Sequence, residues 1–257
     1  MIKYIEESAR LLSFLDDKAD PFACRIASLL RSYPPKYSFV DYWLISDGGT
    51  ETGAVARNGM SFTLFLMDGS DSEEVSSFLK VAGAREVLCD GGCALDLPGY
   101  ATTEGRVFFR DKPIELRASH VLTSPDLRSV YSLLGLCEGE GFALPPFEDF
   151  YPDMNHRLRH KTSRLVGIDK DGELAAVVMT VAESGRSAVL GAAACAPKFR
   201  RQGLGSAAVG AITNELLSEG RRVYLHRAEH ANELFYQSLG FSECGAWREY
   251  RKQQVII

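Results

Sequence analysis

The chain has 257 residues and carries 29 Lys and Arg against 34 Asp and Glu, a formal net charge of −5. This balance lacks the basic excess of a nucleic-acid-binding protein and is compatible with a cationic or neutral substrate. Hydrophobic residues make up 46% of the chain, as in soluble globular proteins, and the length allows one large domain or two small ones.

The first part of the chain predicts a small α/β unit that ends at a polar joint at 111–113. Apolar spacing predicts a helix over 4–15, and Pro21 can open a second helix that the Tyr-Pro-Pro run at 33–35 ends. The other expected elements are strands at 37–45, 53–57 and 62–67, a helix over 70–80 capped by Ser70 or Ser72, and strands at 86–89 and 106–110.

From residue 113 the pattern restarts. The expected elements are a strand over 116–122, a helix over 125–136, a loop over 139–152, a short helix over 153–160, strands over 163–169, 174–182 and 187–196, a helix over 206–219, a strand over 222–227, a helix over 232–239 and a strand over 244–252. The shared order of elements suggests an internal duplication. We therefore expect an α/β (α+β) fold with a mixed, mostly antiparallel sheet flanked by helices, in two similar halves at 1–112 and 113–257.

The cysteines and the apolar runs of the chain indicate the cellular compartment in which the protein is expected. Six sparse cysteines favour reduced thiols in a cytosol over a disulfide scaffold. Cys89 and Cys93 have no second pair and no nearby histidine, so we expect no metal site. Early acids argue against a signal peptide, and the longest apolar run, 174–182, is about half of a membrane span. We expect a cytoplasmic protein that binds neither nucleic acid nor membrane, as a monomer or homodimer.

A basic, glycine-containing loop at 196–206 (A-P-K-F-R-R-Q-G-L-G-S) carries the clearest functional signal. Pro197 ends the preceding strand, and Gly203 and Gly205 let the backbone approach a ligand closely. The helix that begins at Ser206 points free amides with partial positive charge at the loop. Formal charge beside it comes from Lys198, Arg200 and Arg201. This combination predicts a site for a pyrophosphate.

Two other interpretations of this loop stay open. The segment 203–208 (G-L-G-S-A-A) also fits the dinucleotide fingerprint G-x-G-x-x-A, with Glu229 near the place of the ribose-binding acid. However, a proline and several basic residues separate these glycines from the strand, and antiparallel hairpins precede it. The other interpretation is a solvated basic turn that binds nothing.

The loop resembles the R/Q-x-x-G-x-G/A signature of the Gcn5-related N-acetyltransferases (the GNAT superfamily), with Arg200, Gly203 and Gly205 at the signature positions. Downstream, the segment 232–241 (N-E-L-F-Y-Q-S-L-G-F) is similar to that family's helix ending in Tyr-x-x-x-Gly-Phe. The order of elements over 116–252 also matches, so the resemblance covers about half of the chain.

The resemblance implies a transferase that uses acetyl-coenzyme A (acetyl-CoA) as co-substrate. The backbone of the strand before the loop would bind the pantetheine arm, at Ala193, Ala194 and Cys195. The pyrophosphate would bind at Arg200, Arg201, Gln202, Gly203, Leu204, Gly205 and Ser206. An amine then attacks the thioester carbonyl directly, and a backbone amide near the end of this strand polarises that carbonyl.

Tyr236 matches the family's tyrosine, which often protonates the leaving thiolate. A phenol with a pKa of ~10 is protonated at neutral pH and can donate; its alternative role is packing at the cleft edge. Asn232 either caps its helix or touches the cofactor. The family's usual asparagine stands further ahead, where this chain has Glu229.

The general base is not settled by the sequence. The strand 187–196 has no acid where many relatives keep one. Candidates are Glu183, Glu229 and His226, or a chain of waters, and each side chain has a surface salt bridge as its alternative role. Cys195 has no recognisable histidine partner, so we interpret it as a small strand residue and not as a nucleophile.

The substrate region is expected over 139–160, where acids accompany aromatic residues that can line a pocket or fill the core; the residues are Phe142, Phe147, Glu148, Asp149, Phe150, Tyr151, Asp153 and His156. In the first half, acids at 68–74 replace the basic signature and would repel a pyrophosphate. We predict an N-acetyltransferase acting on the primary amine of a small-molecule or amino-acid-derived substrate, supported by an inactive first half. The alternative is a non-catalytic acyl-CoA-binding or sensing module.

Overall fold

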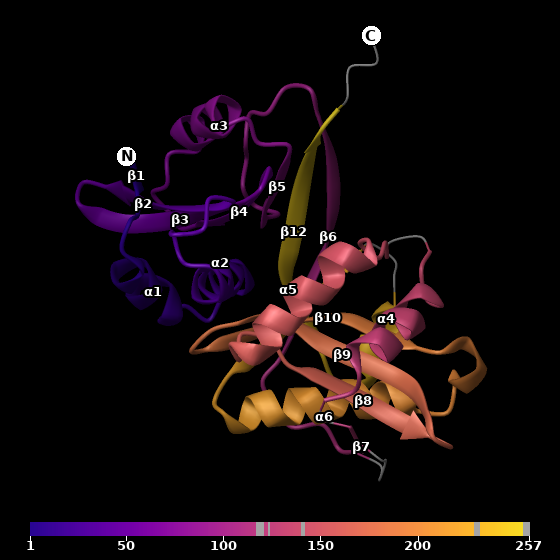
Figure 1. Ribbon diagram of the computed structural model, residues 1–257. Helices are drawn as coiled ribbons and strands as arrows, with labels where there is room; N and C mark the ends of the chain where they lie inside the picture. The colour runs from indigo at the N-terminus through magenta and orange to yellow at the C-terminus, as the bar shows by residue number, and fades with distance from the viewer. Residues whose placement is uncertain (117–120, 123, 140–141, 229–231, 254–257) are drawn as a thin grey trace.

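The computed structural model describes residues 1–116, 121–122, 124–139, 142–228 and 232–253 (Figure 1). The first half contains β1 (Ile2–Tyr4), α1 (Ser8–Asp16), α2 (Pro21–Ser32), β2 (Val40–Asp47), β3 (Thr50–Asn58), β4 (Ser61–Leu66), α3 (Ser72–Val81), β5 (Glu86–Asp90) and β6 (Tyr100–Arg110). The second half contains β7 (Val121–Leu122), α4 (Leu127–Gly135), α5 (Phe147–Arg159), β8 (Leu165–Lys170), β9 (Glu173–Glu183), β10 (Ser187–Cys195), a 3₁₀ turn (Pro197–Phe199), α6 (Leu204–Ser218), β11 (Arg222–Ala228), α7 (Glu233–Ser238) and β12 (Ser242–Lys252).

All strands join one twelve-stranded sheet in the order β1-β2-β3-β4-β5-β12-β6-β11-β10-β9-β8-β7. The pairs β4–β5 and β10–β11 are parallel, and the other neighbouring pairs of the described strands are antiparallel. The predicted fold class is therefore confirmed. The halves also exchange their last strands, because β12 pairs with β5 and β6 pairs with β11 (Figure 1). Each half thus completes the sheet of the other.

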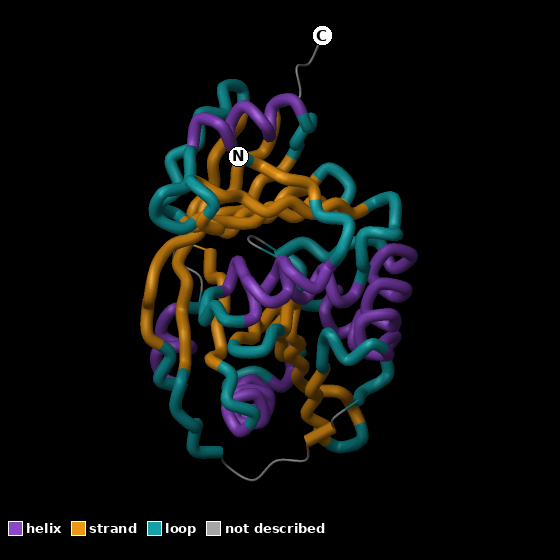
Figure 2. Tube along the Cα trace, turned by 90° about the vertical axis from the view of Figure 1, so that its left-hand side faces the viewer, coloured by secondary structure: helices purple, strands orange, loops and turns teal. Residues whose placement is uncertain are grey.

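Helices cover both faces of the sheet (Figure 2). In the second half α4 and α5 pack on Val177 and Met179, whereas α6 packs on the opposite face, on Val178. In the first half α1 and α2 share one core, while α3 belongs to another. No helix in the described part of the chain is long and apolar enough to cross a membrane.

Helix α2 also fastens the first half to the second. Its Cys24 Sγ donates to the Ser187 carbonyl over 3.3 Å, and Ser28 Oγ donates to the Thr162 carbonyl over 3.2 Å. The core beneath α2 continues from Phe22 into the buried strand residues of the second half, namely Ala182, Val189 and Tyr224. The face of β9 and β10 that carries α4 and α5 is therefore shared with a helix from the other half.

Several predicted element bounds are corrected by tertiary pairing. The expected helix over 4–15 is a strand followed by α1, because residues 2–4 pair with β2. The expected loop over 139–152 already contains α5 from Phe147, and Pro152 lies inside that helix at the cost of one amide hydrogen bond. Asp71, and neither neighbouring serine, caps α3 through the amides of Glu73 and Glu74. Of the expected strand over 116–122, residues 117–120 lie outside the described part.

Candidate active site

The two parallel strands of the second half separate at their carboxyl ends. β10 and β11 pair from Ser187–Arg222 to Leu190–Leu225 and no further, although both strands continue. Beyond that point β10 bulges: Ala192 has φ 46°, and the register with β9 skips from Gly191 to Ala194. A Cβ at Gly191 would lie 2.4 Å from Val181 Cγ1, so glycine is required there. Beyond Leu190, the backbone of β10 has no partner in the described part of β11.

This gap is a cleft of about 930 Å³. Most of the predicted cofactor residues line it, namely Ala193, Ala194, Cys195, Arg200, Arg201, Gly203, Leu204, Gly205, Ser206, Asn232 and Tyr236. Gln202 is exposed and does not line the cleft. The sequence therefore identified one contiguous surface, made by the end of β10, the loop after it, the start of α6 and helix α7.

The loop presents an uncapped helix start to the cleft. Arg201 and Gly203 both have positive φ, at 64° and 80°, and α6 begins at Leu204, directly after Gly203. No side chain in the described part of the chain caps this helix, so the amides of its first turn are available to a ligand. Arg200 donates from Nε to the Cys195 carbonyl over 3.2 Å, which holds the loop against β10. Lys198 instead pairs with Glu173 outside the cleft.

Tyr236 borders the cleft from α7. Its ring packs edge-on against Phe235 and Phe241, with centroid distances of 5.0 and 5.9 Å. Burial raises the pKa of its phenol above the usual value of 10, so the hydroxyl keeps its proton at neutral pH. No described residue hydrogen-bonds to this hydroxyl, which leaves it free to donate to a ligand. Asn232 also borders the cleft, and its side chain does not make the predicted cap hydrogen bond.

Glu183 is placed outside the cleft. It ends β9 opposite Ala188, whereas the cleft begins at Leu190 and extends to Cys195. At about 3.3 Å per residue, the centre of the cleft lies roughly 15 Å further along β10. Glu229, the second candidate base, lies outside the described residues.

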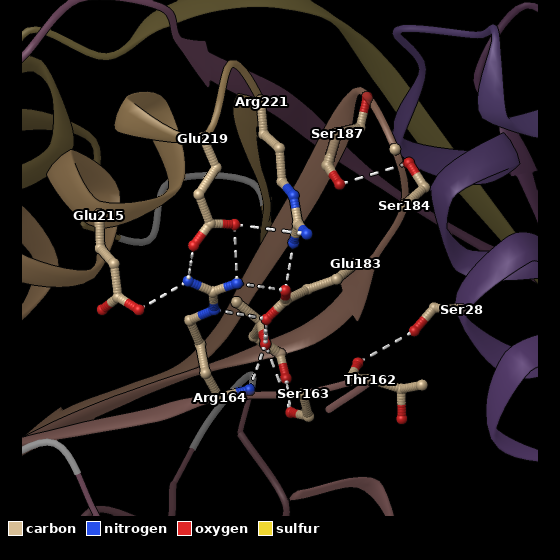
Figure 3. A network of polar contacts seen from close by, with 12 residues as sticks. Ser28, Thr162, Ser163, Arg164, Glu183, Ser184, Ser187, Glu215, Glu219 and Arg221 are labelled. Atoms are coloured by element: carbon tan, nitrogen blue, oxygen red, sulfur yellow. Dashed lines mark hydrogen bonds and ion pairs between the residues drawn. The ribbon is translucent and has the colours of Figure 1, made fainter. Parts of the chain in front are cut away.

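Glu183 is held in a buried ion-pair network (Figure 3). It is 5% exposed, accepts from Arg164 over 2.9 and 2.8 Å, and also contacts Arg221. Arg164 in turn joins Glu219, the residue that directly follows α6, over 2.7 Å. This network ties the end of β9 to the end of α6. We therefore interpret Glu183 as a residue that stabilises the fold.

Replacing Glu183 by glutamine is expected to lower the free energy of unfolding by about 3 kcal/mol, because Arg164 and Arg221 lose a buried counter-charge. The matched change Glu173→Gln, at the exposed start of the same strand, is expected to cost less than about 1 kcal/mol. Urea unfolding measures both. The pKa of Glu219 is lowered below its ordinary value of 4.5, chiefly by its hydrogen bond to Arg164, so the stabilisation from this pair declines as pH falls below about 4.5 and is lost once pH falls through the lowered pKa. Equal effects of the two substitutions would contradict this role for Glu183.

His226, the third candidate base, borders the cleft from β11. Its ring lies between Phe22 of α2, at 5.2 Å, and Trp247 of β12, at 6.4 Å. Burial, with the positive charge of Arg25, lowers the pKa of His226 well below its usual value of 6.5. The imidazole is therefore neutral at physiological pH, and it is a weak acceptor for an ammonium proton.

A second cavity of about 810 Å³ adjoins the first, and Phe142 and Ala192 line both. The predicted aromatic and acidic segment contributes six lining residues to this second cavity, namely Phe142, Glu148, Asp149, Phe150, Asp153 and His156. Phe147 and Tyr151 do not line it and pack beside Arg128 instead. The first half contributes Tyr33, Phe39 and Asn58. Sequence reasoning missed these three residues. It treated Tyr33 only as part of a helix stop, and Phe39 and Asn58 lie in or directly after predicted strands of the other half.

The chain contains two repeats of β-α-α-β-β-β-α-β order that are joined in one sheet. This sheet opens into a cleft at a parallel strand pair. Together these features define a tandem GNAT-type fold. Residues 127–241 match the family model described as the acetyltransferase (GNAT) family, and this part of the chain is a GNAT-family domain.

Solved structures show the same fold across both halves. A tandem GNAT protein from the clavulanic acid biosynthesis pathway superposes with a TM-score of 0.59 at 15% identity, over 99% of each chain. A GCN5-related N-acetyltransferase from Sphaerobacter thermophilus gives a TM-score of 0.62 at 13% identity, over 100% of this chain and 97% of the other. One from Kribbella flavida gives 0.59 at 14% identity, over 92% and 96%. No curated protein sequence matches at a significant level.

Proposed function

We propose that the protein is an N-acetyltransferase that moves an acetyl group from acetyl-CoA to the primary amine of a small-molecule or amino-acid-derived substrate. The observation that carries this proposal is the uncapped start of α6, which faces a cleft between diverging parallel strands. Arg201 and Gly203 both have positive φ and line the cleft, and a turn of this kind directly before a helix suits the binding of a pyrophosphate. Acetyl-CoA supplies the activated acyl group.

Groups of the chain itself perform the remaining steps of the reaction. The backbone of Ala193–Cys195 borders the cleft beside the bulge and can hydrogen-bond an extended arm. Tyr236 donates a proton to the leaving thiolate. Glu183 is locked in ion pairs and His226 is a weak base, so we propose that water in the cleft takes the proton of the attacking amine.

The first half supports the site and does not bind a second cofactor. Its strands β4 and β5 pair in parallel as β10 and β11 do, but the helix that follows β4 is already capped. The Asp71 carboxylate accepts from the amides of Glu73 and Glu74 over 2.9 and 3.0 Å. An anion therefore occupies the place that a pyrophosphate would need, and the two glutamates repel another.

A non-catalytic acyl-CoA sensor is the second candidate. The observation that favours it is the absence of a carboxylate among the described residues that line the larger cleft. A sensor would bind acetyl-CoA and never release free coenzyme A. Turnover with an amine panel therefore separates the two candidates.

Calorimetric titration of the whole protein with acetyl-CoA tests the shared basis of both candidates. We expect saturable binding at one site per chain and no binding of NADH, since the antiparallel surroundings of the loop do not form a dinucleotide fold. A protein that binds no acetyl-CoA at millimolar ligand would show that the loop is only a basic turn. Binding of NADH alone would favour the dinucleotide interpretation.

A further inference from the structure

Arg25 lies in the middle of α2, the helix that fastens the two halves together. No hydrogen bond or ion pair to a described residue engages its guanidinium, and its Nε is closed off from solvent. The residue as a whole is only partly buried. On the same helix, Arg31 is paired with Asp16. Arg25 is therefore a partly buried cation without a counter-ion among the described residues.

The charged residues around Arg25 do not compensate its positive charge. Burial lowers its pKa to about 10, which still leaves it charged at neutral pH. Arg157 of α5 adds a second positive charge nearby, and the acid that acts on Arg25, Glu249, is bound to Arg251 over 2.8 Å. An uncompensated buried charge is costly, and a bound anion removes that cost.

A second unpartnered group lies beside the same helix. Phe22, one helical turn before Arg25, contacts the His226 ring, and His226 Nε2 is buried without a hydrogen-bond partner. Trp247 lies parallel to that ring, with an interplanar angle of 9°, and its Nε1 donates to the Arg227 carbonyl over 2.9 Å. These packed aromatic rings lie at the edge of the cleft, because His226 also lines the cleft.

The guanidinium of Arg25 and the imidazole of His226 together determine which chemical group fits at this place. A guanidinium presents paired donors that match the two oxygens of a carboxylate. A neutral imidazole that carries its proton on Nε2 adds another donor. A neutral or cationic group at this place would leave Arg25 uncompensated. The arrangement therefore fits a carboxylate.

We propose that Arg25 and His226 bind a carboxylate of the acceptor, so that the substrate is an amine that also carries a carboxylate: an amino acid or an amino-acid derivative. The proposal rests on the proposed acetyltransferase function. The carboxylate sits between the halves while the amine reaches the cleft at β10. The first half, which lacks a cofactor site of its own, thereby determines which amines are accepted.

The test compares amines that differ only in their carboxylate. Coenzyme A release from acetyl-CoA is measured with glycine, phenylalanine and glutamate, each beside its α-amide. We expect the wild type to prefer at least one acid over its amide by about tenfold or more in kcat/KM. Arg25→Met is expected to lower kcat/KM for that acid by about 10- to 100-fold, mainly through KM, and to leave the amide unchanged. Arg25→Lys should restore part of the preference.

The control is Arg10→Met on α1, where the arginine is exposed and paired with Glu51 over 2.8 Å; it should keep the wild-type preference. Melting temperature is measured alongside, without acetyl-CoA. The preferred acid is expected to raise the melting temperature of the wild type but not that of Arg25→Met. Arg25→Met alone should not lower it, because the chain loses an unpaired charge.

Two results would overturn the proposal: a wild type that acetylates no acid faster than its amide, or an Arg25→Met protein that melts clearly lower and retains the preference. Failure of the proposed function is distinguishable, because it would appear as absent acetyl-CoA binding in calorimetry. A carboxylate-dependent rise in melting temperature that requires Arg25 would persist in that case.

Discussion

The Gly203→Ala protein is expected to bind acetyl-CoA about 100-fold more weakly than the wild type while it remains folded. Gly203 has φ 80°, a conformation that L-residues adopt at a cost of roughly 1–2 kcal/mol. A Cβ there meets no protein atom within 4 Å, so the free protein tolerates the methyl group. The methyl group would occupy the space in which the pyrophosphate approaches the first amides of α6. Calorimetric titration with acetyl-CoA measures the loss.

Gly220→Ala is the matched control for this substitution. Gly220 follows the other end of α6, has φ 79°, and also has open space around an added Cβ. The two variants should therefore lose similar amounts of stability in urea unfolding, and only the Gly203 variant should lose affinity. If both variants bound acetyl-CoA equally well, the start of α6 would not be the phosphate site.

The features that could be predicted correctly from the sequence depend on residues that are close together along the chain. A strand-ending proline, two glycines (of which Gly203 has positive φ) and a periodic helix sit within one short stretch, so the loop at 196–206 could be placed without tertiary information. The Tyr236 helix and its Gly-Phe end were found for the same reason. Backbone preferences and helix ends depend on neighbours along the chain, and these are visible in a sequence.

The features that the sequence did not indicate depend on partners far along the chain. The exchange of β6 and β12 pairs Trp247 with Gly105 and with Asp90, and no local pattern specifies that choice. Glu183 stands on the strand beside β10, yet only the register shows that it lies at the opposite end from the cleft. Arg25 has an ordinary place on an amphipathic helix, and its lack of a counter-ion among the described residues becomes visible only when the second half packs against it.

Tyr236→Phe is expected to lower kcat by about 100-fold or more, the usual contribution of a positioned proton donor, and to leave acetyl-CoA affinity within about twofold. The substitution removes a hydroxyl that has no hydrogen bond to a described residue and keeps the ring between Phe235 and Phe241, so stability should change little. Steady-state coenzyme A release and calorimetry give the two measurements. A variant with unchanged kcat would reduce Tyr236 to a packing role.

The pH profile adds a separate check on the same residue. Because burial raises the pKa of Tyr236 above 10, the donor stays protonated from neutral pH to about pH 10, and the wild-type rate should show no decline from loss of this proton in that range. The matched control is Tyr224→Phe on β11: the Tyr224 hydroxyl donates to the Ala19 carbonyl, so this variant should lose stability but retain kcat. A large loss of kcat in both variants would mean that the rate reports damage to the sheet, whereas a loss confined to Tyr236→Phe assigns the proton to the cleft.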